Sequence, residues 1–419
     1  MTDDLMKSSG SGDAGNSTHA DEQRLYPKVR FRGFDEPWKK VKLGEIATTY
    51  SGGTPKAGNK KYYNGLIPFI RSGEIHSNKT ELFISEAGLK NSSAKMVTKG
   101  DLLYALYGAT SGEVDISKIN GAINQAVLAI IPKQYNPYII SLLLSKKKDA
   151  ILSKYLQGGQ GNLSAEIVKS IKLILPSKNE ESSLYPLFKV LDNLLSLQHR
   201  KMELENQTSK AIYNYLFDKN KPFYFKDNKT KKVFLKELGT TYSGLSGKNK
   251  TDFGHGKAKY ITYLNVNKNT IANHNLLDLI EIDKKQNEVL NGDILFTISS
   301  ETPEEVGLAS LWPYDDTNIY LNSFCFGFRP NSKINNLWLA YELRSLKIRK
   351  NMYKLAQGIS RYNLSKKSVL NLQVDVPSDA EQNFDSKFVK LINIQTKFLS
   401  NERNELLLLK KFLLQNLFI

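Results

Sequence analysis

The chain is poor in the residues that build disulfides and metal sites. It has one cysteine, Cys325, in the apolar run SFCFGF, and five histidines scattered without the spacing of metal ligands. A lone cysteine cannot form an internal disulfide, and its apolar setting predicts a core position and a reducing compartment, the cytoplasm. The histidine pattern argues against a structural zinc site, so no metal is expected.

Long apolar runs and catalytic motifs are also missing. No apolar run reaches the roughly 18–20 residues of a membrane span, so no membrane partner is expected. The phosphate-binding loop, H-E-x-x-H and G-x-S-x-G do not occur. YNPY at 135–138 is faintly similar to the Asn-Pro-Pro-Tyr of amino-group DNA methyltransferases, but its second proline is missing. Pro137 fits the first turn of a helix better. No catalytic residue is predicted.

What the chain does have is positive charge. Its 419 residues carry 59 Lys and Arg against 42 Asp and Glu, a formal net charge of +17. Such an excess predicts attraction to a polyanion, and nucleic acid is the commonest one. The alternatives are an organism whose proteins are basic in general, or a merely soluble surface.

A fourteen-residue stretch near the start returns in the second half. VKLGEIATTYSGGT at 41–54 is matched by VFLKELGTTYSGLS at 233–246, with eight identical positions at an offset of 192 residues. That offset exceeds the roughly 20–50-residue period of solenoid repeats. It fits a duplicated domain with a connector.

Three further pairs of segments extend the repeat in the same order. They are KGDLLYAL (99–106) with NGDILFTI (291–298), AINQAVLAIIPK (122–133) with YLNSFCFGFRPN (320–331), and the Gln-Gly, Asn-Leu-Ser and Pro-Ser motifs of 155–177 with those of 355–378. The predicted parts of the chain are a disordered tail at 1–25, domains at 26–180 and 221–380, and long helices at 181–220 and 381–419.

Both copies predict the same α+β fold. A short capped helix opens each copy, several short β-branched or aromatic strands follow, and a longer helix precedes a final strand that ends at a proline. In the second copy the expected strands include KYITYLNV (259–266), and the longer helix is expected as one element over 337–357.

The two long helices are predicted from apolar residues near heptad spacing. These are Leu187, Leu194, Leu197 and Leu204 in the first helix, and Leu391, Ile394, Phe398 and Leu408 in the second. At 1.5 Å per residue the first helix would span roughly 50 Å, more than one small domain usually covers. A twofold relation between the halves would set these coiled-coil-like helices antiparallel, with a globular domain at each end. The alternative is that each helix packs only on its own domain.

Basic loops interleaved with aromatic residues are the candidate DNA surface. Lysines would neutralise phosphates, and amide, hydroxyl, guanidinium or carboxylate groups would read base edges. The candidates in the first copy are Thr54, Lys56, Lys60, Lys61, Tyr62, Tyr63, Arg71, Ser72, Asn78, Tyr107, Thr110 and Ser111. Those in the second copy are Ser246, Lys248, Lys250, Lys259, Tyr263, Asn265, Asn267, Ser299, Ser300 and Glu301. For any one of them a plain surface or turn role is the competing reading.

The ordered motifs resemble one family, the specificity subunits of type I restriction-modification systems. The resemblance is carried by W-x-x-V-K-L-G-E-I from Trp38, SGGTP, IPFIRSGEI, GDLLYAL and INQAVLAI, and by the repeated closures with long helices after them. It covers the chain from about residue 26 to its end. One departure lies after the closing Pro-Ser, where such domains commonly carry an acidic residue and Gln. The second copy has Glu381-Gln382, whereas the first reads NEESS.

The resemblance implies two target recognition domains, each reading one half of a bipartite, asymmetric double-stranded DNA site. It implies that the long helices set the spacing and dock two methyltransferase (modification) subunits, and that restriction/translocase subunits join the complex. S-adenosylmethionine, ATP and Mg²⁺ would belong to those partners, and this chain would hold no cofactor. Two other functions remain open at this point: a self-sufficient DNA methyltransferase or nuclease with a diverged site, and a helical protein–protein adaptor.

Overall fold

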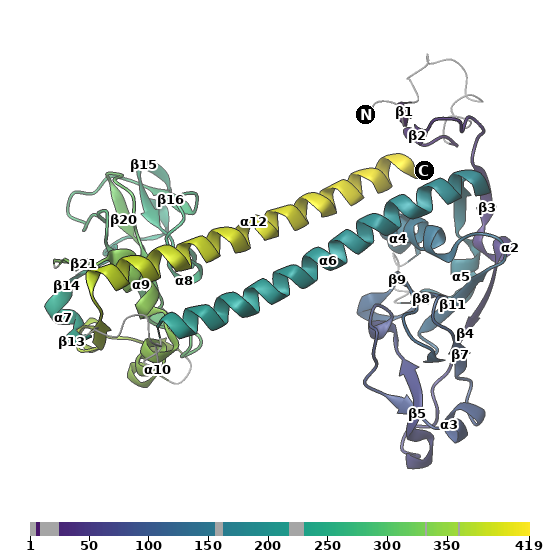
Figure 1. The fold of residues 1–419 in the computed structure, drawn as a ribbon, viewed down its shortest axis with the longest axis horizontal. Helices are drawn as coiled ribbons and strands as arrows, with labels where there is room; N and C mark the ends of the chain where they lie inside the picture. The colour runs from purple at the N-terminus through teal and green to yellow at the C-terminus, as the bar shows by residue number, and fades with distance from the viewer. Residues whose placement is uncertain (1–5, 9–24, 156–161, 218–229, 332, 359–360) are drawn as a thin grey trace. The chain divides into compact units, whose positions relative to one another are not determined.

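The computed structural model describes residues 6–8, 25–155, 162–217, 230–331, 333–358 and 361–419 (Figure 1). The chain forms two compact units. Unit 1 comprises Met1–His199 and Glu402–Ile419, and unit 2 comprises Arg200–Asn401. Most of the predicted tail at 1–25 lies outside the described residues. Within it, strand β1 (Met6–Ser8) pairs antiparallel with β2 (Val29–Phe31).

Both units are built on a four-stranded antiparallel sheet, called here the framework sheet. In unit 1 its order is β4 (Ala47–Ser51), β11 (Val127–Pro132), β8 (Leu102–Ala105) and β9 (Val114–Ile116). In unit 2 it is β14 (Gly239–Ser243), β21 (Cys325–Pro330), β17 (Ile294–Thr297) and β19 (Ala309–Leu311). The strands correspond one to one, and so the predicted α+β fold occurs twice.

Each unit also has a second sheet, and here the two differ. In unit 1 it has the order β6 (Phe83–Ile84), β5 (Tyr63–Ile70), β10 (Gly121–Ile123) and β7 (Lys95–Val97). In unit 2 it has three strands, β16 (Leu277–Ile280), β15 (Phe253–Ile261) and β20 (Ile319–Leu321). Both contain one parallel pair, β5 with β10 and β15 with β20.

A two-stranded ladder joins the start and the end of each copy. It is β3 (Lys39–Lys42) with β12 (Lys172–Leu175) in unit 1, and β13 (Lys231–Phe234) with β23 (Gln373–Val376) in unit 2. The short helices α2 (Leu43–Ile46) and α7 (Leu235–Leu238) follow the first strands. Their amides at Leu43 and Leu235 donate to the carbonyls of Ile171 and Leu372. The repeated opening and closing motifs are therefore one piece of structure.

The repeated Gly-Asp pairs form the same kind of turn in both units. Gly100 and Gly292 have φ of 105° and 89°, in the left-handed region that favours glycine. The following Asp101 and Asp293 accept hydrogen bonds from the amides of Thr98 and Leu290 at 2.7 and 2.8 Å. The turn delivers the chain into β8 and β17, the central strands of the framework sheets.

The Asn-Leu-Ser motif connects the framework sheet to a helix cap. The amides of Leu163 and Leu364 donate to the carbonyls of Leu106 and Ile298. The next residues, Ser164 and Ser365, cap helices α5 (Ala165–Ser170) and α11 (Lys366–Leu370) through their side chains. The preceding Gln-Gly of the first copy lies outside the described residues.

Two sequence predictions for unit 2 were wrong. The strand expected over 259–266 ends at Ile261, and helix α8 (Tyr263–Lys268) begins because the Thr262 hydroxyl accepts from the Asn265 amide. The helix expected over 337–357 is two helices, α9 (Asn336–Leu343) and α10 (Leu346–Leu355). Ser345 caps the second of them, which interrupts the ladder that a continuous helix would need.

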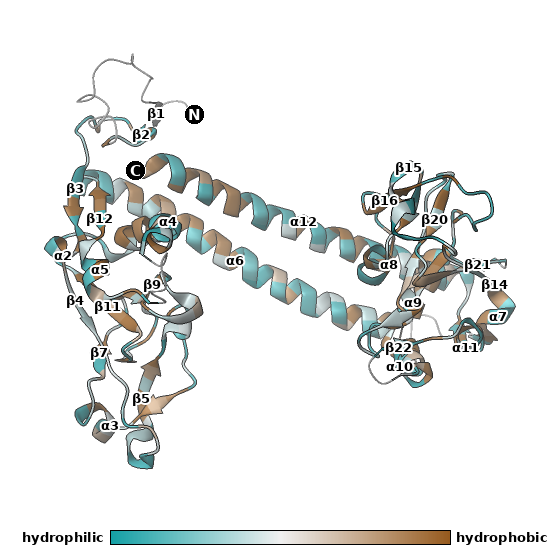
Figure 2. Ribbon diagram, turned by 180° about the vertical axis from the view of Figure 1, so that it is seen from behind, coloured by the Kyte–Doolittle hydropathy of each residue, from teal (hydrophilic) through white to brown (hydrophobic). Residues whose placement is uncertain are grey.

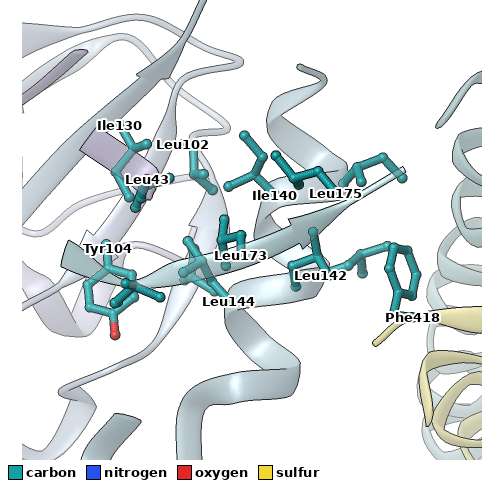
Figure 3. Close-up of a cluster of buried hydrophobic side chains, with 14 of the residues drawn as sticks. Leu43, Leu102, Tyr104, Ile130, Ile140, Leu142, Leu144, Leu173, Leu175 and Phe418 are labelled. Carbon is teal, nitrogen blue, oxygen red and sulfur yellow. The ribbon is translucent and has the colours of Figure 1, made fainter. Parts of the chain in front are cut away.

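The core of unit 1 lies between its framework sheet and helix α4 (Pro137–Tyr155). Figure 3 shows side chains from the sheet, from α4, from β12 and from the end of the chain meeting there. Phe418 is 2% exposed and packs edge-on against Trp38, with ring centroids 5.9 Å apart. In unit 2 the corresponding places are filled by Leu216 and Phe217. Cys325 is buried in unit 2, as predicted, and burial raises the pKa of its thiol.

The long helices are α6 (Lys178–Leu216) and α12 (Asp379–Leu417), each of 39 residues. Both begin directly after a serine, and Ser177 and Ser378 accept from the amides of Glu180 and Glu381 at 3.4 Å. This places both starts slightly before the predicted ones. Asn136 and Asn335 donate their amides to Glu181 and Gln382. The copy that lacks the usual Gln therefore uses Glu181 in the same place.

Within unit 1 the two long helices run antiparallel. Phe188 contacts Phe418, Asp192 accepts from Lys410 at 2.5 Å, and Gln198 donates to Glu402 at 2.9 Å. As the residue number rises along α6, the residue number of its contact near the end of α12 falls, which is the pattern of antiparallel helices. Of the eight apolar residues predicted for the helices, only Leu187 packs on the unit 1 core. Leu194, Leu197, Leu204, Leu391, Ile394, Phe398 and Leu408 are exposed, and Figure 2 shows hydrophobic positions recurring along both helices.

Candidate nucleic-acid interface

The basic segment of unit 1 is held by hydrogen bonds that leave its lysines outside. The Tyr63 hydroxyl donates to the carbonyl of Pro55 at 2.6 Å, and the Ser85 hydroxyl donates to the carbonyl of Lys61 at 2.6 Å. Tyr62 and Tyr63 are half-buried by this arrangement. Lys56, Lys60 and Lys61 are exposed, as is Thr54, whose hydroxyl donates to Gln125 at 2.6 Å. The three lysines are therefore exposed on a segment that these hydrogen bonds hold in place.

A bulge beside this segment exposes Leu66, which was not predicted from the sequence. Tyr63 and Ile67 of β5 both pair with Ile84, so the residues between them are looped out. Asn64 has φ of 57°, and Leu66 is 94% exposed. In unit 2, Phe253 and Ala258 of β15 likewise both pair with Ile280. There the looped-out residues include His255 and Lys257, both exposed. Bulges are not visible as a sequence period.

The Arg71 guanidinium is already engaged by acidic side chains of unit 1. Its guanidinium donates to Glu74 at 2.9 and 3.0 Å and to Glu81 at 2.8 Å. These bonds raise the pKa of Arg71. Burial alone would raise the pKa of Glu74, but the bonds from Arg71 and from the backbone lower it to about 2. Ser72 is half-buried next to this cluster, and Asn78 is exposed.

The three candidates after β8 lie mostly inside unit 1. Tyr107 is half-buried and forms a bridge with Asn162. Thr110 ends the 3-10 helix η3 (Gly108–Thr110) and is half-buried. Ser111 is buried, and its hydroxyl donates to the carbonyl of Leu106 at 2.9 Å. This placement gives Ser111 a structural role in the turn.

Of the candidate lysines in unit 2, two are exposed and the third is paired with an acidic side chain. Lys250 and Lys259 are exposed, and so is Ser246. Lys248 instead pairs with Asp283 at 2.8 Å, and this bond, with those from Lys285 and Gln286, lowers the pKa of Asp283 to about 2. Lys248 therefore ties the loop after β14 to the 283–286 turn.

Two asparagines predicted to read DNA are buried, and the fold explains why. Asn265 donates through its amide to the carbonyls of Asn273 and Leu276 at 2.8 and 2.9 Å, and accepts from the Asn273 amide at 2.8 Å. It organises the loop that precedes β16. Asn267 is 4% exposed on the same short helix, α8. Both side chains point into the fold because 259–266 does not continue as a strand.

The other four candidates of unit 2 come together in one pocket of about 270 Å³. The pocket is lined by Tyr263, Ser299, Ser300, Glu301, Glu305, Phe324 and Arg361. The last three were not predicted from the sequence. Phe324 lies in an apolar run that reads as core, yet it is 54% exposed. Arg361 lies in the segment between the Gln-Gly and Asn-Leu-Ser motifs, where the two copies differ.

A larger groove of about 630 Å³ lies in unit 1 between the start of α4 and α6. Its lining includes Lys99, Lys118 and Lys189 together with Tyr138 and Asp192. The Tyr138 hydroxyl donates to Asp192 at 2.5 Å, and the Lys189 ammonium lies 5.3 Å from the Tyr138 ring centroid. The lysines come from segments far apart in the sequence, so no motif reveals them.

The described residues show neither a metal-binding cluster nor a membrane-spanning helix. They contain no group of three or more His, Cys, Asp or Glu side chains placed to hold a metal ion. Among the same residues, no helix is both long and apolar enough to cross a membrane.

A duplicated α+β unit with basic exposed loops and a long helix after each copy defines a class of two-domain DNA-binding subunits. The family described as the type I restriction modification DNA specificity domain matches residues 35–206 and again 227–408. The chain belongs to this family: it is a type I restriction-modification specificity subunit with two target recognition domains, and such subunits are non-catalytic.

Known proteins agree with this assignment. The chain is 22% identical to the type I restriction enzyme MjaVIII specificity subunit of Methanocaldococcus jannaschii over 90% of this chain and 91% of that one. It is 26% identical to the MjaIX specificity subunit of the same organism over 51% of this chain. This match spans about half (53%) of that relative's length. The fold matches the crystal structure of an S subunit from M. genitalium with a TM-score of 0.59 and 16% identity, covering 93% and 97% of the two chains.

Proposed function

We propose that each target recognition domain reads one half of a bipartite, asymmetric DNA site. The observation that carries this proposal is the contrast between the two kinds of sheet. The framework sheets have the same strand order in both units, whereas the second sheets and the loops around them differ. A shared framework with separate reading surfaces is what two unrelated half-sites require.

Charge supports duplex DNA as the ligand. Exposed lysines gather beside the second sheet of both units, at Lys56, Lys60 and Lys61 in unit 1 and at Lys250 and Lys259 in unit 2. Lysines would hold phosphates and position the domains, and base contacts would supply the specificity. Affinity for duplex DNA should then fall steeply with added salt, which would distinguish a DNA reader from a protein–protein adaptor.

The exposed apolar residues of α6 and α12 are the proposed docking surface for two methyltransferase subunits. Leu197, Leu391 and Phe398 are each more than 60% exposed, although they repeat at helical spacing. One similar structure was solved to explain complex assembly and conformational transition in a type I restriction-modification system. Its chain matches this fold with a TM-score of 0.57 at 14% identity. The helices would also fix the spacing between the half-sites.

The proposed complex divides the chemistry among its subunits. The methyltransferase subunits would bring S-adenosylmethionine, and the restriction/translocase subunits would bring ATP hydrolysis with Mg²⁺. This chain would direct them to the site in the cytoplasm.

Methylome sequencing tests the proposal. In a host with the gene and the genes of its methyltransferase partners, long-read sequencing should show adenine methylation in one bipartite motif with two unrelated halves, and deletion of this gene alone should remove it. Methylation or cleavage by the purified chain without partners would contradict the proposal.

A further inference from the structure

The floor of the 270 Å³ pocket in unit 2 is fixed by hydrogen bonds. Strand β18 (Ser299–Ser300) pairs with β22 (Tyr362–Asn363), and the Tyr263 hydroxyl donates to the carbonyl of Ser299 at 2.8 Å. Ser299 is one of the residues that line the pocket. Ser299 is 9% exposed, and within the described residues its hydroxyl has no hydrogen-bond partner. The pocket thus has a rigid polar floor.

Its rim carries both signs of charge. Glu305 accepts from the Ser300 hydroxyl at 3.3 Å and has the Lys268 ammonium at 3.9 Å. Glu301 and Arg361 are exposed at the same opening. A phosphate site would collect positive groups only, because carboxylates repel phosphate oxygens. Acceptors next to a guanidinium donor suit a base-pair edge, on which acceptor and donor atoms lie side by side.

The aromatic wall of the pocket has no counterpart at the equivalent turn of unit 1, which is among the described residues. The Asn322 side chain accepts from the Phe324 amide at 2.8 Å, and the Asn124 side chain accepts from the Ala126 amide at 3.0 Å. The two turns are equivalent, yet unit 1 has a buried alanine where unit 2 has an exposed phenylalanine. The Arg361 guanidinium carbon lies 6.0 Å from the centroid of the Phe324 ring, which helps to hold it at the rim.

We infer that this pocket reads a G·C base pair of the half-site recognised by unit 2. Arg361 donates to guanine O6 and N7, and Glu301 accepts from the N4 amino group of the paired cytosine. Phe324 packs on the base edge and shields these bonds from water. Arg361 and Glu301 are then specificity-determining residues. The inference rests on the proposed function and names the chemistry that one of its two reading surfaces recognises.

The test uses the complete complex with its methyltransferase subunits. Methylation rates are measured on duplexes in which each base pair of the methylome motif is replaced in turn. Glu301→Gln and Arg361→Gln should each reduce the preference for G·C by about tenfold or more at one position, and at the same position in both variants. The other half-site should keep its full selectivity. Glu166→Gln, the same change on an exposed carboxylate of unit 1, should leave every position unchanged.

Three results would overturn the inference. One is unchanged selectivity at all positions in both variants, and another is relaxation at an A·T position. The third is relaxation of different half-sites by the two variants. Should Arg361→Gln fail to assemble, Phe324→Ala replaces it and must relax the position that Glu301→Gln relaxes. Failure of the proposed function is distinguishable, since the wild-type complex would then methylate no bipartite motif.

Discussion

The Asp293 carboxylate holds the Arg329 guanidinium through two hydrogen bonds of 2.9 and 2.8 Å. The Tyr242 hydroxyl donates to the same carboxylate at 2.6 Å, and Asp293 is only 1% exposed. Asp101, at the same place in unit 1, has the turn bond from Thr98, but Ile131 stands where unit 2 has Arg329, and the Tyr50 hydroxyl donates to the Met96 carbonyl. One framework position therefore has a different energetic role in each unit.

Replacing Asp293 by Asn should destabilise unit 2 by about 2–3 kcal/mol, since bonds between charged groups are lost and Arg329 keeps only its bond to the Glu288 carbonyl. Hydrogen exchange measures this as reduced protection of β17 and β21. Asp101→Asn is the matched control and should cost unit 1 less. Equal losses in the two units would show that the turn, and not the ion pair, matters.

Replacing Phe418 by Ala should destabilise unit 1 by about 3–5 kcal/mol, because a fully buried ring between Trp38 and Phe188 is removed. Chemical unfolding of the purified chain, followed by hydrogen exchange in β12 and α4, measures the loss. Phe412→Ala removes a ring that is 55% exposed on helix α12 and should change stability by less than about 0.5 kcal/mol. Similar effects of the two changes would contradict the packing described here.

Replacing Glu181 by Gln should stabilise unit 1 at neutral pH. Burial raises the pKa of Glu181 above its ordinary value, although the bond from the Asn136 amide and the charge of Lys178 oppose the shift. Folding therefore favours the protonated form, and the charged form lowers stability as pH rises through the folded pKa. Gln382 fills the same place in unit 2 without charge. Thermal unfolding should show the gain at pH 7 and its disappearance below about pH 4.5, where Glu181 is protonated in both states. A gain that persists in acid would refute the electrostatic cause.

Lengthening the helices should move the half-sites apart. Four residues inserted after Lys201, with a matching turn after Asn401 in α12, add ~6 Å to each helix at 1.5 Å per residue. Methylome sequencing should then show a gap longer by about one or two base pairs, with both half-sites unchanged. An unchanged gap would mean that the helices do not set the spacing.

The sequence predicted the framework well because the repeated residues make the same contacts twice. Gly-Asp turns, Asn-Leu-Ser caps and Pro-Ser helix starts are local features whose chemistry is visible in the residues themselves. The reading surfaces were harder to predict. Arg71 was chosen for its guanidinium, but Glu81, ten residues further along, takes up part of it.

The positions of the other candidate residues depend on burial and on contacts between segments far apart in the sequence. Asn265 and Asn267 are polar residues in a segment whose strand-like composition did not reveal helix α8. The apolar run SFCFGF predicts a core position for Cys325, yet the Asn322 turn directs its neighbour Phe324 outward. Arg361 reaches the pocket only because β22 pairs with β18, a contact between segments far apart in the sequence.

The burial of Phe418 in unit 1 has a consequence for synthesis of the chain. A ribosome makes the sheet and helix α4 of unit 1 first, but Phe418, whose ring packs in their core, is translated only after residues 200–401 of unit 2. Unit 1 must therefore wait, with its core incomplete, while all of unit 2 is made. A nonsense mutation shortly before codon 418 would leave the unit 2 segment intact and still damage unit 1, which is encoded mostly upstream of it.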